Sequence, residues 1–191
     1  ISTAMHEDAI AALKNADKKM AKEVIVTDDE VDRFNHYIIR QLKSAIQGEI
    51  LLKDIGLTTP REILGYRLIT KSIERMADHA ANIAREVLEL REEVNPETIE
   101  RISKMSSSAN SVFTEAIEAL FNQDFQSADK VVEEAKKTTL MEKDVIRTIL
   151  KKAEPEAPSL RLITESIRRT AEYASDIAEI VLNLTIEKIL P

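Results

Sequence analysis

The apolar positions of this chain follow the spacing of amphipathic α-helices along most of its length. In residues 60–92 and 158–189 the apolar side chains fall on one side of a helix that turns about 100° per residue. The first stripe consists of Ile69, Ile73, Met76, Ala80, Ile83 and Val87, and the second of Ile163, Ile167, Ala171, Ala174, Ile177 and Val181. Alanine recurs in these stripes, which predicts close helix–helix approach in antiparallel bundles.

Prolines and glycines divide the chain into six predicted helices. Pro60, Pro96 and Pro158 stand where helices are expected to begin, because a proline in the first turn gives up no hydrogen bond. Gly56 is expected to end the second helix. The predicted helices span residues 1–19, 24–54, 60–92, 96–122, 125–153 and 158–189. The predicted fold class is therefore all-α.

A self-comparison reveals an internal repeat. Residues 9–21 (AIAALKNADKKMA) match 116–128 (AIEALFNQDFQSA) at an offset of 107, and residues 67–84 (RLITKSIERMADHAANIA) match 161–178 (RLITESIRRTAEYASDIA) at an offset of 94. The two matches occur in the same order. The sequence therefore predicts tandem duplicated three-helix bundles.

The repeat also sets the expected domain organisation. We expect a first three-helix repeat in residues 1–94 and a second in residues 95–191. The offset falls by 13, so the first repeat carries about 13 additional residues, which we place within 43–57. The alignment pairs Ile1 with Ser108, although the fourth predicted helix begins near Pro96. The first helix is thus shorter than its counterpart, and we expect residues upstream of Ile1 in the full protein.

Composition narrows the function classes. The net charge is −7 and the basic residues are mixed with acids, which argues against direct nucleic-acid contact by this chain. The chain has no cysteine, which excludes disulfides and thiolate metal sites and fits a cytoplasmic location. No apolar run approaches the roughly 20 residues that a membrane-spanning helix needs, so we expect no membrane insertion.

Four carboxylates are the strongest candidates for a binding site. Glu74 and Asp78 are four residues apart on one predicted helix, and Asp28 and Asp32 repeat this spacing on the helix before it. Residues at this spacing project from the same side of a helix. Four such carboxylates on neighbouring helices could hold a hard cation or an iron-type ion through oxygen ligands. His36 and His79 are possible nitrogen ligands nearby.

The alternative to a metal site is that the same carboxylates form a solvent-exposed helix face whose negative charge is neutralised by arginines. The candidate arginines are Arg33, Arg67, Arg75 and Arg85. The repeat limits a metal site to the first half of the chain. In the alignment of the two repeats, Asp28 and Asp32 correspond to Ala135 and Thr139. Glu74 corresponds to Arg168, and Asp78 corresponds to Glu172.

No catalytic motif supports an enzyme. No Glu is followed three residues later by His, as the di-iron bundles require. The three histidines stand in no hydrolase motif, and the glycines are too isolated for a phosphate loop. We therefore expect a protein that acts by binding rather than by catalysis.

The repeated segments resemble the PhoU family, whose mark is a duplicated three-helix bundle that bears E(D)xxxD motifs. IERMADHAANI at residues 73–83 and DDEVDRFNHYIIRQL at residues 28–42 carry this resemblance, the latter in a form typical of archaeal members. It implies a regulator of phosphate uptake and phosphate signalling that acts on a phosphate ABC transporter ATPase or a sensor kinase. It also implies iron or zinc at Asp28, Asp32, Glu74 and Asp78, and a homodimer.

One alternative function stays open. Some archaeal members of the family carry an AbrB-like DNA-binding domain before this one. The chain could then be the helical dimerisation or effector domain of a transcription regulator whose DNA-binding domain lies upstream of residue 1. The sequence upstream of Ile1 would distinguish the two functions.

Overall fold

The chain folds into six α-helices, as the apolar pattern predicts. A computed structural model describes residues 1–186, and no strand occurs within that range. The helices are α1 Ser2–Asn15, α2 Lys18–Ile46, α3 Pro60–Glu89, α4 Pro96–Asn122, α5 Phe125–Lys151 and α6 Ala157–Thr185, with a short 3₁₀-helix, η1, at Leu52–Ile55. The predicted end of the last helix, at residue 189, lies outside the described residues.

The connection between the first and second helices of each repeat, α1 to α2 and α4 to α5, is built in the same way. Asp17 accepts hydrogen bonds from the backbone N–H groups of the first residues of α2, and Asp124 does the same at the start of α5. The residue before each aspartate is left-handed, with φ of 49° at Ala16 and 50° at Gln123. The predicted boundaries at residues 19 and 24 are therefore wrong, because α2 begins directly after its aspartate cap.

The second helix ends earlier than predicted. It stops at Ile46, and residues 47–59 form a linker that contains η1. Gly56 ends η1 rather than the second helix, in the left-handed conformation at φ 76° that glycine adopts without strain. The corresponding linker of the second half, residues 152–156, is much shorter. Most of the additional residues of the first repeat thus lie in this linker.

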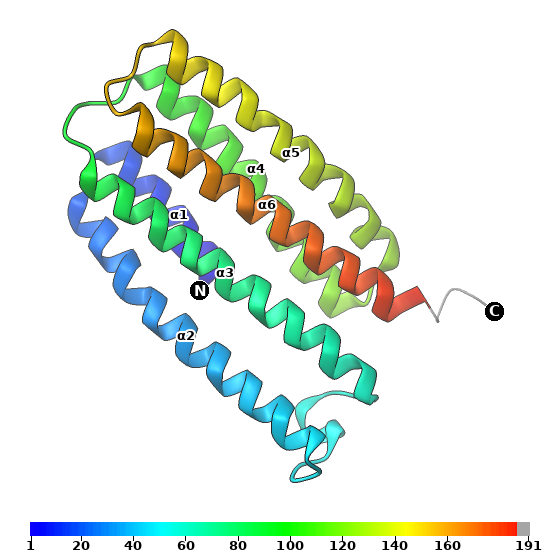
Figure 1. The fold of residues 1–191 in the computed structure, drawn as a ribbon. Coiled ribbons are helices and arrows are strands. Elements are labelled where there is room, and N and C mark those ends of the chain that lie inside the picture. The colour runs from blue at the N-terminus through cyan, green and yellow to red at the C-terminus, as the bar shows by residue number, and fades with distance from the viewer. Residues whose placement is uncertain (187–191) are drawn as a thin grey trace.

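The helices form a bundle in which α3 and α6 run side by side through the middle (Figure 1). In the first half α2 packs on α3 and α1, and in the second half α5 packs on α6 and α4. The halves meet through α3 against α6 and through α1 against α4. Equivalent helices therefore face each other across the boundary between the repeats.

The core crosses this boundary. Both predicted stripes are buried, apart from Ile73, which is half-buried, and one apolar cluster takes residues from all six helices. The alanines of the two stripes, Ala80, Ala171 and Ala174, are fully buried within the chain, so they serve its internal packing rather than association between chains. Across residues 1–186, no helix combines the length and the apolarity that crossing a bilayer requires.

Candidate metal site between α2 and α3

Three of the four predicted carboxylates converge between α2 and α3. One oxygen each from Asp32, Glu74 and Asp78 lies within 4.8 Å of the others, and all three residues are half-buried. Asp28 lies one turn before Asp32 and has its carboxylate 3.8 Å from the guanidinium of Arg85. The spacing of four residues on each helix produces this arrangement, because α2 and α3 pack side by side and present both pairs to the same seam.

Burial and the neighbouring negative charges both favour the protonated form of the carboxyls in the cluster. The pKa of Asp78 is raised to about 6, first by burial and then by the negative charges of Glu74 and Asp28. The pKa of Asp28 is also raised, by burial and by Asp32, against the opposing charge of Arg85. Negative charge therefore accumulates here beyond what the neighbouring cations neutralise, and a bound cation would relieve it.

Two basic side chains neutralise part of the cluster. Arg85, one of the four predicted arginines, pairs with Asp28 and donates a hydrogen bond to Asn82 at 2.6 Å. Lys71 donates a hydrogen bond to Glu74 and lowers the pKa of Asp78. The sequence contained the signal for Lys71, which precedes Glu74 by three residues and so lies on the same helix face.

The two histidines proposed as nitrogen ligands do not join the cluster. His36 is exposed, and its Nδ1 lies 2.7 Å from the carbonyl oxygen of Asp32 one turn earlier in α2. His79 faces α6, where its ring nitrogens lie 3.2 Å from Ser166 Oγ and 3.2 Å from Tyr173 OH. Adjacent residues of a helix point about 100° apart, so Asp78 and His79 cannot share one site. The donor set is oxygen only.

The second repeat replaces the acidic cluster with an ion-pair network. Ala135 is buried, and Thr139 donates its hydroxyl to the carbonyl of Ala135. Arg168, at the position of Glu74, pairs with Glu142 at 3.4 Å, Glu165 at 3.7 Å and Glu172. The pair Lys71–Glu74 of the first repeat is thus reversed to Glu165–Arg168 in the second.

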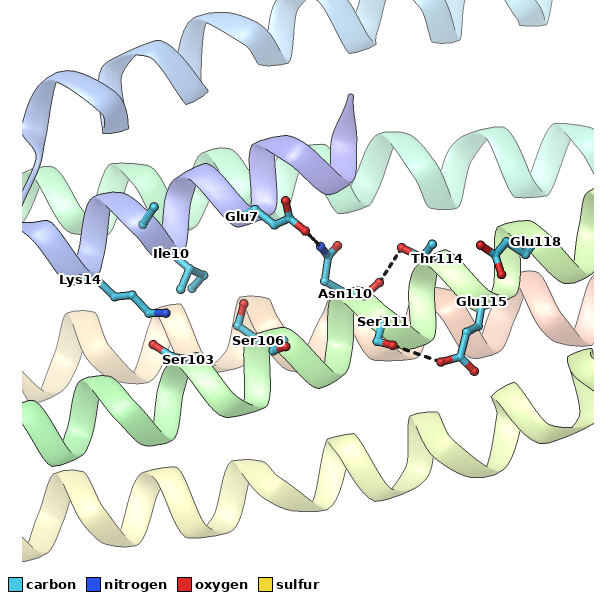
Figure 2. Close-up of a pocket in the computed structure, with 12 residues that line it drawn as sticks. Glu7, Ile10, Lys14, Ser103, Ser106, Asn110, Ser111, Thr114, Glu115 and Glu118 are labelled. Atoms are coloured by element: carbon cyan, nitrogen blue, oxygen red, sulfur yellow. Dashed lines mark hydrogen bonds between the residues drawn. The ribbon is translucent and has the colours of Figure 1, made fainter.

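A separate cavity of about 570 Å³ lies between α1 and α4 (Figure 2). Hydroxyl side chains from the serine-rich stretch of α4 line it, and Asn110 donates a hydrogen bond to Glu7 across it at 2.8 Å. One lining residue, Ser106, is hydrogen-bonded at 2.9 Å to Nε2 of the fully buried His6. Sequence reasoning missed this cavity, for which the run of three serines at 106–108 was the available signal.

The comparisons with known proteins point to one family. The model of the PhoU domain family matches residues 1–87 and 102–181. A phosphate-specific transport system accessory protein PhoU homolog of Borreliella burgdorferi is 30% identical over 132 residues, which are 66% of this chain and 57% of that protein. PhoU homolog 1 of Thermotoga maritima is 25% identical over 189 residues, covering 92% of this chain and 77% of that protein.

The coverage of the relatives is partial. The matched part spans 57% of the Borreliella protein and 55% of a homolog from Clostridium acetobutylicum, little more than half of their length. Two crystal structures share the fold. PhoU from Pseudomonas aeruginosa matches with a TM-score of 0.84 at 22% identity, covering 97% of this chain and 90% of that one. The phosphate transport system regulatory protein PhoU from Streptococcus pneumoniae matches with a TM-score of 0.83 at 20% identity, covering 100% and 90%.

Proposed function

Because this chain belongs to the PhoU domain family, we propose that it regulates phosphate uptake and phosphate signalling through contacts with other proteins. The observation that carries the proposal is the family match itself, which extends over all six helices. The relatives are described as accessory proteins of a phosphate-specific transport system. The proposed partners are the ATPase of a phosphate ABC transporter or a sensor kinase, and the proposed site of action is the cytoplasm.

Deletion of the gene tests this function. Cells that lack the protein should lose the difference in phosphate uptake between growth in high and in low phosphate, and a plasmid copy should restore it. A pull-down from cells grown in the two media should recover the transporter ATPase or the kinase. Unchanged uptake in the deletion strain in both media would refute the proposal.

A role in binding rather than catalysis is supported by the buried histidine. His6 contacts Ser106, which resembles a base beside a nucleophile, but its other nitrogen lies 3.4 Å from the hydroxyl of Thr170 rather than beside a carboxylate. Burial lowers the pKa of His6 to about 4, which makes it a weak base. A hydrolase needs a base that a carboxylate orients and whose pKa lies near the working pH.

We further propose that Asp28, Asp32, Glu74 and Asp78 hold a metal ion. The convergence of three oxygens and the raised pKa of Asp78 support this assignment. Oxygen-only ligands suit iron or a hard cation better than zinc, which prefers nitrogen and sulfur ligands. The bound ion would neutralise the cluster and tie α2 to α3.

A homodimer is also proposed. The buried alanines cannot contribute to it, and we place the dimer contact on α2, where Phe34 and Tyr37 are each 55% exposed and Ile38 is 40% exposed. Aromatic side chains of this kind are enriched in interfaces. Sedimentation that detects only monomers at high concentration would refute the dimer.

A further inference from the structure

A groove lies between α5 and α6 on the second half of the molecule. It has a volume of about 860 Å³ and lies between the C-terminal half of α5 and the N-terminal half of α6. Ile146 and Leu150 line it from α5, and Pro158 and Leu162 line it from α6. Leu150 is 66% exposed and Leu162 is 49% exposed, so the groove leaves large apolar side chains in contact with water.

The rim of the groove carries positive charge that the chain leaves uncompensated. Its two acids, Glu142 and Glu165, are both paired with Arg168. Lys143 and Arg161 also line the groove, are exposed, and form no ion pair with any residue in 1–186. This local excess stands out on a chain whose net charge is −7.

We propose that this groove binds an amphipathic helix of a partner protein that presents leucine-type side chains flanked by carboxylates. The apolar lining residues are four apart on both walls, at Ile146 and Leu150 and at Pro158 and Leu162, so they form two ridges along the groove. A third helix fits between such ridges with residues at a spacing of three and four, and its flanking carboxylates would face Lys143 and Arg161.

This inference names the surface for the protein contacts proposed above, and it rests on that function. A protein helix can place its carboxylates opposite Lys143 and Arg161 alone, whereas phosphates recur along a whole nucleic acid and some of them would face Glu142 and Glu165. A second copy of this chain is the competing occupant, and the experiment below separates it from a partner helix.

The test uses the purified chain and a fluorescent peptide of about 18 residues, long enough for five helical turns. The peptide has leucine at every third or fourth position and glutamate on both flanks, and its control has lysine in place of glutamate. The expected result is binding with a dissociation constant on the order of 10 µM that weakens as salt is added, and at least about tenfold weaker binding of the lysine peptide.

Variants assign the binding to the groove. Leu150→Glu with Leu162→Glu should weaken binding of the glutamate peptide about tenfold, whereas Val26→Glu, at a position on α2 that is 68% exposed, should leave it unchanged. Arg161→Glu should weaken binding of the glutamate peptide and strengthen binding of the lysine peptide. Circular dichroism melting curves establish that each variant is folded.

Three outcomes would overturn the proposal. The first is equal binding of both peptides, and the second is unchanged binding by the folded double leucine variant. The third is a chain that sediments as a dimer and becomes monomeric with Leu150→Glu and Leu162→Glu, since a second copy would then occupy the groove. If the peptide fails to bind while gene deletion still abolishes the phosphate response, the surface is wrong and the proposed function stands.

Discussion

His79 and Tyr173 occupy the same position of the two repeats and contact each other at the boundary between them. Tyr173 OH lies 3.2 Å from Nε2 of His79, and the ring centroids are 5.7 Å apart. Residues related by the repeat offset of 94 can touch only near the axis that relates the two halves. The pair therefore lies where α3 and α6 meet across the boundary between the repeats, and the difference between the two side chains provides a donor and an acceptor.

Removing the hydroxyl of Tyr173 should destabilise the protein. Tyr173→Phe leaves one ring nitrogen of the half-buried His79 without its partner. The expected loss is about 1 kcal/mol of the free energy of unfolding, measured by urea denaturation. The matched control is Tyr37→Phe on the exposed face of α2, which should change stability by less than half as much. Equal effects of the two substitutions would contradict the structural role.

The stability of the protein should fall as the pH decreases from about 6.5 to about 4 because of His6. Burial holds the pKa of His6 in the folded state at about 4, below the ordinary histidine value of 6.5, so the unfolded chain binds the proton more readily over this range. A shift of this size corresponds to roughly 3 kcal/mol at the acidic end.

The variant that isolates this effect is suggested by the repeat. Phe113 stands at the position of the second repeat that corresponds to His6 and is itself buried. His6→Phe should therefore be accommodated and should flatten the decline of stability between pH 6.5 and 4. If the free energy of unfolding, measured by chemical denaturation, declines with pH in the same way for the wild type and for His6→Phe, then His6 is not the source of the decline.

The acidic cluster should produce the opposite pH dependence in protein treated with a chelator. The folded pKa of Asp78 is raised from 3.8 to about 6, so its contribution to stability is fully present below pH 3.8 and is lost as the pH rises through 6. Asp78→Asn should remove this loss and raise the melting temperature of the metal-free protein at pH 7. A lower melting temperature of Asp78→Asn under these conditions would contradict the repulsion between the carboxylates.

Metal binding should depend on the first repeat alone. After growth in medium supplemented with iron and zinc, elemental analysis should find metal in the wild type and none after Glu74→Ala with Asp78→Ala. Glu172→Ala should retain it, because Glu172 pairs with Arg168 and Arg169 instead. Less than about one metal ion per ten chains, together with a melting temperature that chelator leaves unchanged, would mean that the carboxylates form only a solvated surface.

The loop between α5 and α6 should contribute strongly to stability. Glu156 accepts hydrogen bonds from the backbone N–H groups of Arg91 at 2.8 Å and Glu92 at 3.0 Å, in the segment that joins the two repeats. Glu156→Ala removes a charged acceptor from two donors and should cost about 2 kcal/mol in urea denaturation. The control is Glu93→Ala, which is exposed in the same segment and should be nearly neutral. A neutral Glu156→Ala would exclude this bracing role.

Periodicity and proline placement predicted the fold well, because the helices bury apolar stripes and α2 to α6 each have a proline or an aspartate cap at their first turn. They failed at Ala16, where the chain turns without glycine or proline at a left-handed alanine. The same limits apply to the site. The spacing of four residues correctly predicted that Asp32, Glu74 and Asp78 lie close together, because the side of a helix from which a side chain projects depends only on helix geometry. Whether His79 faces α2 or α6 depends on the packing of three helices, which spacing within one helix does not contain.

Glu74 in the first repeat corresponds to Arg168 in the second, so the carboxylates of the two halves are neutralised by different sources of positive charge. The guanidinium of Arg168 is tethered to the backbone, so its three carboxylate neighbours keep their counter-charge whatever the solution contains. The three carboxylates of the first repeat must draw part of theirs from dissolved ions, whose supply varies. The stability of the second half should therefore be insensitive to added cations, whereas the stability of the first half should change with them.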